Sequence, residues 1–206
     1  KGVMLTHRNI TYNVDTMRPL IPLDPGDRAL SFLPISHIFE RAVVYAYTAY
    51  GASVSFTGTD NLGGENGDFK AIKPHFFTVV PRLLEKVYER ILEKGLELKG
   101  PKRAIFFWAL GLTDHWAFEQ KPGFLTGLQR RIADRLVFSK WRDALGGQIR
   151  GVVTGASPCP LKIMRTFNAA GIPLREGYGM SEAAPALSFS RYESKGALLG
   201  TVNRRE

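Results

Sequence analysis

Apolar positions follow two different spacings along the chain, and the spacing predicts which segments are strands and which are helices. Short runs of β-branched and aromatic residues, typical of buried strands, lie at residues 28–33, 52–56, 75–80, 148–155, 173–179 and 186–190. Apolar residues at helical spacing lie at residues 7–17, 36–50, 81–94, 103–119, 125–137 and 160–171. Because strands and helices alternate, we predict an α/β fold, with a layered, mostly parallel sheet flanked by helices.

Local signals set the ends of several predicted helices. Thr6 is expected to cap the first helix, and Pro81 stands at the start of the third, where proline is favoured. Gly51 and Gly95 are each expected to end a helix. The polar, glycine-rich residues 57–68 are read as a loop that could tolerate insertion, and no domain boundary or internal repeat is evident.

Composition narrows the class of protein. The 206 residues are 44% hydrophobic and 23% charged, which is ordinary for a packed globular domain. The longest apolar run, residues 104–112, is far shorter than the roughly 20 residues that span a bilayer. No signal peptide precedes the fold, and the single cysteine, Cys159, fits a reducing compartment. We therefore expect a cytoplasmic protein.

The net charge of +9 favours partners that carry negative charge. Part of the excess lies in residues 121–150, which hold seven basic residues against two acidic ones. Most of these are expected to form a solvated helix face. Nucleic acid is disfavoured because no zinc-ligand spacing, single-strand platform or recognition helix accompanies the charge. Binding to an anionic lipid surface stays open.

Three segments are predicted to follow strands at the same edge of the sheet, where α/β proteins bind ligands. They are "LPISHIFER" (residues 33–41), "TGASPCP" (residues 154–160) and "GYGMSE" (residues 177–182). In the second, Gly155 lets the backbone approach a flat ligand or adopt a left-handed conformation, and Ser157 is expected to cap the next helix, although a simple capped turn explains both. In the first, His37 stands just past a strand end, and a lone histidine is more often structural than functional.

The third segment carries the most specific chemistry. Tyr178 offers a ring that can stack on a base, and Gly179 leaves the backbone bare beside it. Ser181 supplies a hydroxyl for a phosphate oxygen, and Glu182 is a hard oxygen ligand suited to Mg²⁺. Together they suit a nucleoside triphosphate. Glu176, just before them, is given no role and is expected to face solvent or a basic side chain.

The three segments, in this order, resemble the AMP-forming adenylate-forming enzymes. "KGVMLTHRNI" resembles the end of that family's phosphate loop, and "GYGMSE" its Tyr-Gly-x-Thr-Glu motif, with Ser181 in place of threonine. "GALLGTV" (residues 196–202) resembles the glycine-rich segment that follows, although Asn203 stands where glycine is common. "LPISHIFER" and "FFTVVPRLLEKVYERI" are similar to the long-chain fatty acid–CoA ligases, and the resemblance covers essentially the whole chain.

The resemblance implies nucleotide-binding roles at matching positions. Lys1 would end the phosphate loop, and Tyr178 would pack against the adenine. The positions that would contact adenine and line the acyl pocket are Gly155, Ala156 and Ser157, although "TGASPCP" departs from the common Gly-Gly-Ala-Pro-Leu form.

The same resemblance implies the catalytic positions. Gly179 and Met180 would lie beside the reacting carboxylate and the α-phosphate. Ser181 would touch phosphate, Glu182 would hold Mg²⁺, and His37 would sit by the acyl carboxylate.

The implied reaction joins a long-chain fatty acid to coenzyme A at the expense of ATP, through acyl-AMP. The cofactors would be ATP, Mg²⁺ and CoA, with peripheral membrane attachment left open. The chain is expected to be a central piece of the large domain, without the hinge and the small C-terminal domain, and to have little activity alone. A non-catalytic nucleotide- or acyl-binding module, or activation of a different carboxylic acid, remains an alternative.

Overall fold

The computed structural model describes residues 2–118 and 123–192. Its helices are α1 (His7–Met17), α2 (Ile38–Ala49), α3 (Asp68–Ile72), α4 (Pro81–Glu97), α5 (Pro101–Gly111), α6 (Phe124–Ala133), α7 (Ser139–Ala144) and α8 (Leu161–Ala169). Its strands are β1 (Arg28–Ser31), β2 (Ser53–Phe56), β3 (Phe76–Val79), β4 (Gly151–Thr154), β5 (Leu174–Gly179) and β6 (Ala186–Phe189). Short 3₁₀ segments lie at η1 (Arg18–Leu20) and η3 (Ser181–Ala183), and a π-helical segment, η2 (Asp134–Phe138), joins α6 to α7.

The strands form one sheet in the order β2-β1-β3-β4-β5-β6. The first five run parallel, and β6 returns antiparallel to β5 as a hairpin. Parallel strands end at the same edge, so the loops after β1, β4 and β5 leave the sheet on one side. The predicted mostly parallel α/β architecture is confirmed.

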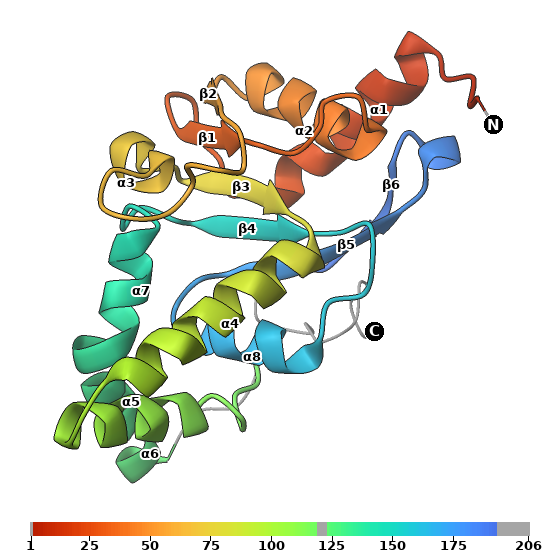
Figure 1. Cartoon of the computed structure of the whole chain (residues 1–206). Coiled ribbons are helices and arrows are strands. Elements are labelled where there is room, and N and C mark those ends of the chain that lie inside the picture. Colours follow the sequence, from red (N-terminus) through yellow and green to blue (C-terminus); the bar gives the residue numbers. More distant parts are fainter. Residues whose placement is uncertain (1, 119–122, 193–206) are drawn as a thin grey trace.

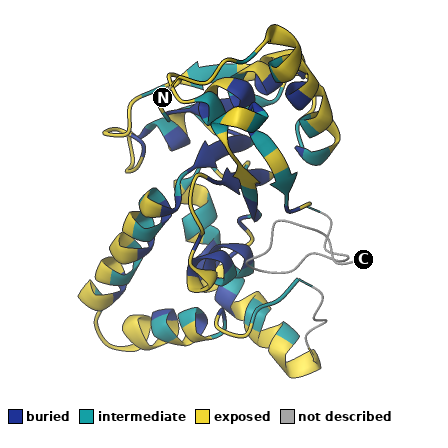
Figure 2. Ribbon diagram, turned by 90° about the vertical axis from the view of Figure 1, so that its right-hand side faces the viewer, coloured by how far each residue is buried: buried dark blue, intermediate teal, exposed yellow. Residues whose placement is uncertain are grey.

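Helices cover both faces of the sheet, and the alternation of side chains along each strand explains how (Figure 1). On β3, Phe76 packs with α1 and α2, whereas Phe77 packs with the larger cluster under α4 and α8. On β4, Val153 packs in the cluster with α1 and α2, whereas Val152 packs in the larger cluster under α4 and α8. Figure 2 shows the buried residues concentrated along the strands between these layers. The strands are therefore buried on both sides, as parallel strands require.

The predicted first helix is confirmed to the residue, and its capping explains why. Thr6 accepts a hydrogen bond from the backbone N–H of Asn9, and the Asn9 side chain accepts one from the backbone N–H of Thr6. This reciprocal pair satisfies two of the backbone donors that a helix start leaves free.

Gly95 does not end its helix, contrary to the sequence prediction. Helix α4 continues to Glu97, and a Cβ built on Gly95 would lie 2.1 Å from Cε1 of Phe106 on α5. The glycine is therefore required by close packing of two helices. Helices α4 to α7 form an arm that extends away from the sheet (Figure 1). None of the helices in residues 2–118 and 123–192 is long and apolar enough to cross a membrane.

Candidate active site

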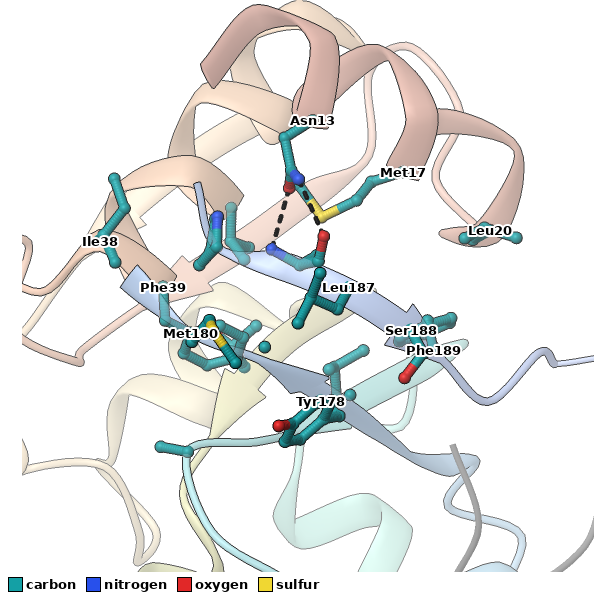
Figure 3. Close-up of a pocket in the computed structure, with 18 of the residues that line it drawn as sticks. Asn13, Met17, Leu20, Ile38, Phe39, Tyr178, Met180, Leu187, Ser188 and Phe189 are labelled. Carbon is teal, nitrogen blue, oxygen red and sulfur yellow. Dashed lines mark hydrogen bonds between the residues drawn. The ribbon is translucent and has the colours of Figure 1, made fainter. Parts of the chain in front are cut away.

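A pocket lies between the carboxyl edge of the sheet and the helices α1 and α2 (Figure 3). Most of its walls are apolar, and they come from both helices, from β3 and β4, and from the β5–β6 hairpin. Six of the predicted site residues line it: His37, Ala156, Tyr178, Gly179, Met180 and Ser181. Segments distant in sequence thus meet at one edge, as predicted from their positions after parallel strands. Gly155, Ser157 and Glu182 are not among the lining residues.

The loop after β4 has a different conformation from the one predicted. The left-handed residue is Ala156, with φ of 70°, and not Gly155. Ser157 does not cap the next helix, because α8 begins only at Leu161 and its N-cap residue is Pro160, without a side-chain cap. Gly155 is instead closely packed, since a Cβ there would make a tight contact of 3.2 Å with the carbonyl oxygen of Gly177.

The β5–β6 hairpin presents two of the predicted residues at the pocket. Tyr178 is 52% exposed and Met180 is 44% exposed, so both have surface available to a ligand. At Gly179 there is no space for a side chain. A Cβ on it would lie 2.0 Å from the carbonyl oxygen of Pro185, and the backbone N–H of Met180 donates to that oxygen at 2.9 Å. The glycine therefore lets the hairpin close.

Glu182 lies on the turn at the tip of this hairpin. It belongs to η3, directly after the pocket-lining Ser181, and its side chain is exposed. In the described residues, no group of three or more His, Cys, Asp or Glu side chains could hold a metal ion alone. A single exposed carboxylate nevertheless fits Mg²⁺, which is usually bound by one or two carboxylates together with substrate phosphates and water.

His37 begins α2 at the mouth of the pocket. Its Nδ1 accepts a hydrogen bond of 3.3 Å from the backbone N–H of Phe39, so the ring caps the helix. The imidazole is exposed and lines the pocket. The capping role and the predicted position beside a ligand are therefore compatible, because one ring nitrogen remains available for a ligand.

Glu40, one turn further along α2, is a buried carboxyl that sequence reasoning missed. Its two oxygens accept hydrogen bonds of 2.5 Å from Ser31 on β1 and from Thr78 on β3. Burial raises the pKa of Glu40, and these two hydrogen bonds oppose the rise. Since Thr78 lines the pocket, Glu40 ties the helix that carries His37 to the strand that forms the pocket floor.

Asn13 of α1 was also missed. Its side-chain nitrogen donates to the carbonyl oxygens of Ala183 at 3.3 Å and Ala186 at 3.0 Å, and its oxygen accepts from the N–H of Ala186 at 3.2 Å. Figure 3 shows this side chain reaching down to the hairpin. Asn13 therefore bonds both ends of the turn that follows Glu182.

Glu176 faces neither solvent nor a basic side chain, contrary to the prediction. It is 8% exposed, and its Oε1 accepts a hydrogen bond of 2.9 Å from the backbone N–H of Cys159. The carboxylate thus ties β5 to the loop after β4 and brings two of the three predicted segments together. Lys1, the segment at residues 196–202 and Asn203 lie outside the described residues.

Comparison with known proteins gives a family match and a group of relatives. The family described as "AMP-binding enzyme" matches residues 1–204. Long chain acyl-CoA synthetase 8 of Arabidopsis thaliana is 33% identical, over 94% of this chain and 28% of that protein. Long-chain-fatty-acid–CoA ligase FadD15 of Mycobacterium bovis is 31% identical, over 99% of this chain and 34% of that protein. The chain thus spans about a third or less of the length of these relatives.

Solved structures share the fold. The o-succinylbenzoate CoA synthetase MenE of Bacillus subtilis matches 94% of this chain and 30% of its own, with a TM-score of 0.60 and 16% identity. The N-terminal domain of FACL13 from Mycobacterium tuberculosis matches 94% of this chain and 37% of its own, with a TM-score of 0.58 and 16% identity. The family match extends over nearly the whole sequence, as the resemblance in the sequence analysis predicted. The chain therefore belongs to the AMP-binding enzyme family.

Proposed function

We propose that the protein containing this chain activates a long-chain fatty acid with ATP, first to acyl-AMP and then to acyl-CoA. The observation that carries the proposal is an apolar pocket bordered by the polar side chains of His37, Tyr178 and Ser181, from two of the three strand-end loops. The similarity to proteins named as long-chain acyl-CoA synthetases supports the same assignment. We further propose that the chain is a central piece of their large domain.

The pocket suits an alkyl chain bound with its carboxylate at the polar edge. Apolar walls gain free energy by covering methylene groups, about 0.8 kcal/mol for each one buried. The apolar side chains that line the pocket include Met17, Leu20, Ile21, Ile38, Phe39, Val43, Phe76, Val153, Leu187 and Phe189. We assign binding of the carboxylate to His37 at the mouth of the pocket.

In the first step a carboxylate oxygen of the fatty acid attacks the α-phosphorus of ATP, and the bond from that phosphorus to pyrophosphate breaks. An anion must approach a polyanion, so the site has to orient both reactants and balance their charge. We assign adenine stacking to Tyr178 and a hydrogen bond to phosphate to the hydroxyl of Ser181. Gly179 and Met180 border the reacting groups, and Ala156 borders the nucleotide.

Glu182 is the residue that would hold Mg²⁺, which would supply positive charge beside the phosphates. In the second step the thiolate of CoA attacks the acyl carbon, and the bond to AMP breaks. The predicted roles of Lys1, Gly155 and Ser157 in binding nucleotide remain proposals, as do a cytoplasmic location and peripheral attachment to a membrane.

Replacing Asn13 with alanine in the full-length enzyme is expected to raise the KM for ATP about tenfold more than the KM for the fatty acid. The substitution removes three hydrogen bonds that hold the turn beside Glu182. Net contributions of about 1 kcal/mol for each buried hydrogen bond make a tenfold effect attainable. Initial rates at varied ATP and at varied fatty acid separate the two KM values.

Thr16→Ala is the matched control for Asn13. Thr16 also lines the pocket from α1, but its hydroxyl donates at 2.8 Å to the carbonyl of Tyr12 within the same helix. This variant should leave the KM for ATP unchanged. If Asn13→Ala lowers thermal stability and leaves both KM values unchanged, the residue only supports the fold and the positioning role is wrong.

Pyrophosphate release tests the proposed reaction. The full-length enzyme with ATP, Mg²⁺ and palmitate is expected to release pyrophosphate, and CoA should then convert the palmitoyl adenylate to palmitoyl-CoA. The isolated 206-residue chain is expected to show little or no turnover.

ATP binding by calorimetry without turnover of any acid would favour a non-catalytic nucleotide-binding module. Turnover of o-succinylbenzoate but not of palmitate would contradict the substrate class.

A further inference from the structure

A layer of buried polar side chains lies between the sheet and α2, next to the pocket. It consists of Ser31 on β1, Glu40 and Tyr47 on α2, and Thr78 on β3, and each of them is at most 2% exposed. In the residues that the structure describes, the hydroxyl of Tyr47 has no hydrogen-bond partner. Buried polar groups that are only partly satisfied lower the stability of a fold. Stability alone therefore does not account for this layer.

Glu40 joins the layer to two neighbouring strands. Ala29 and Phe76 pack with α1 and α2, so Ser31 and Thr78, each two residues further along its strand, face the same side of the sheet. Their hydroxyls donate to the two oxygens of Glu40, both at 2.5 Å. Since β1 and β3 are adjacent, one carboxylate bridges both strands. These bonds fix the first turn of α2 on the sheet, because hydrogen bonds to a carboxylate are strong and directional.

The same turn carries His37. The backbone N–H of Arg41 donates to the carbonyl oxygen of His37 at 3.2 Å, and the backbone N–H of Phe39 donates to its imidazole at 3.3 Å. The imidazole is therefore fixed to the helical turn that Glu40 holds. Thr78, the other partner of Glu40, lines the pocket floor. Glu40 thus sets where the imidazole at the mouth lies relative to the floor.

We propose that Glu40 is a positioning residue for the fatty acid, which holds the imidazole of His37 where it meets the carboxylate of the acid. The inference rests on the proposed function, because it takes the acid to be the ligand of His37. A residue that acts on the ligand only through His37 loses its effect once the imidazole is removed. A residue that only stabilises the fold impairs the protein equally with and without the imidazole.

Initial rates of pyrophosphate release by the full-length enzyme test the proposal. Glu40→Gln keeps the size of the side chain but replaces one accepting oxygen with a donor. It is expected to raise the KM for palmitate about tenfold, which is the effect of losing one hydrogen bond to a charged group, and to change the KM for ATP less than about twofold. Ser31→Ala removes one of the two hydrogen bonds and is expected to raise the KM for palmitate about threefold to tenfold.

A double-mutant cycle with His37→Ala separates positioning from structural support. His37→Ala by itself is expected to raise the KM for palmitate about tenfold or more. Adding Glu40→Gln to it should change that KM by less than about twofold. Effects of the two substitutions that multiply would overturn the proposal, as would a rise in the KM for ATP equal to that for palmitate.

Tyr50→Phe is the matched control, because it removes a buried hydrogen bond of 2.7 Å to the carbonyl oxygen of Val14 at the opposite end of α2. It is expected to leave the KM for palmitate unchanged. Thermal unfolding shows which variants are folded, and Ser31→Ala takes the place of Glu40→Gln in the cycle if the latter is not.

The same experiment distinguishes failure of this inference from failure of the proposed function. No turnover of palmitate by the unchanged protein would contradict the proposed function and this inference together. Normal turnover by the unchanged protein, with effects of His37→Ala and Glu40→Gln that multiply, would overturn this inference alone.

Discussion

Replacing Glu182 with alanine in the full-length enzyme is expected to slow acyl-adenylate formation at least about a hundredfold, or about 2.7 kcal/mol in the activation free energy. Glu182 is the exposed carboxylate on the turn directly after the pocket-lining Ser181. Without it, Mg²⁺ would lose its protein ligand beside the phosphates, and the charge that develops there would be less well balanced.

The rate of pyrophosphate release across a Mg²⁺ titration measures this effect. Glu182→Gln should be nearly as impaired, because an amide keeps the shape of the side chain but loses the negative charge. Glu65→Ala is the matched control, since Glu65 is an exposed glutamate in a distant loop and should leave the rate unchanged. An unchanged rate for Glu182→Ala at saturating Mg²⁺ would show that the assigned metal role is wrong.

Replacing Gly179 with alanine is expected to lower the same rate about tenfold to a hundredfold and to destabilise the fold by roughly 1–3 kcal/mol. The new Cβ would lie 2.0 Å from the carbonyl oxygen of Pro185 and 2.9 Å from its carbonyl carbon. These are backbone atoms, which cannot move aside as the end of a flexible side chain can. The hairpin must therefore open, and the turn that carries Ser181 and Glu182 moves with it.

Gly177→Ala provides a closely matched control for Gly179. It lies two residues earlier on the same strand, and its Cβ would meet Phe189 at 3.5 Å and Val153 at 3.6 Å, which are ordinary contacts. Kinetics and thermal unfolding of both variants separate a change in the turn from a general loss of stability. Similar behaviour of the two variants would contradict the proposed requirement for glycine at residue 179.

The fold was predictable because its signals are local. Strands buried on both faces consist of apolar runs, and the short connections between strands and helices are marked by proline, glycine and capping residues. Where the prediction was wrong, the cause was either a contact from another element or a proline in the loop itself. Gly95 is accommodated inside α4 because Phe106 of the next helix packs against it. Ser157 does not cap α8 because the chain first passes through Pro158 and Pro160 before the helix begins.

The residues that hold the site together were harder to find in the sequence. Asn13 and Glu40 each occupy a position in the apolar stripe of their helix, so a polar residue in that stripe was an available signal. A polar residue in an apolar stripe does not, however, indicate which groups it forms hydrogen bonds with. Asn13 binds backbone 170 and 173 residues away, and the partners of Glu40 lie on two different strands.

By itself, the sequence determined the α/β class and the family, and it predicted that three strand-end segments lie at one edge of the sheet. Residue type and the alternation of strands with helices are enough for these, since parallel strands end at one edge. The tertiary structure alone decided that Ala156 takes the left-handed conformation, that Glu176 is buried against Cys159 and that Asn13 bonds the β5–β6 hairpin. Each of these outcomes depends on contacts between segments that are distant in sequence. Burial and hydrogen bonding are set by how the chain packs and not by the neighbouring residues in the sequence.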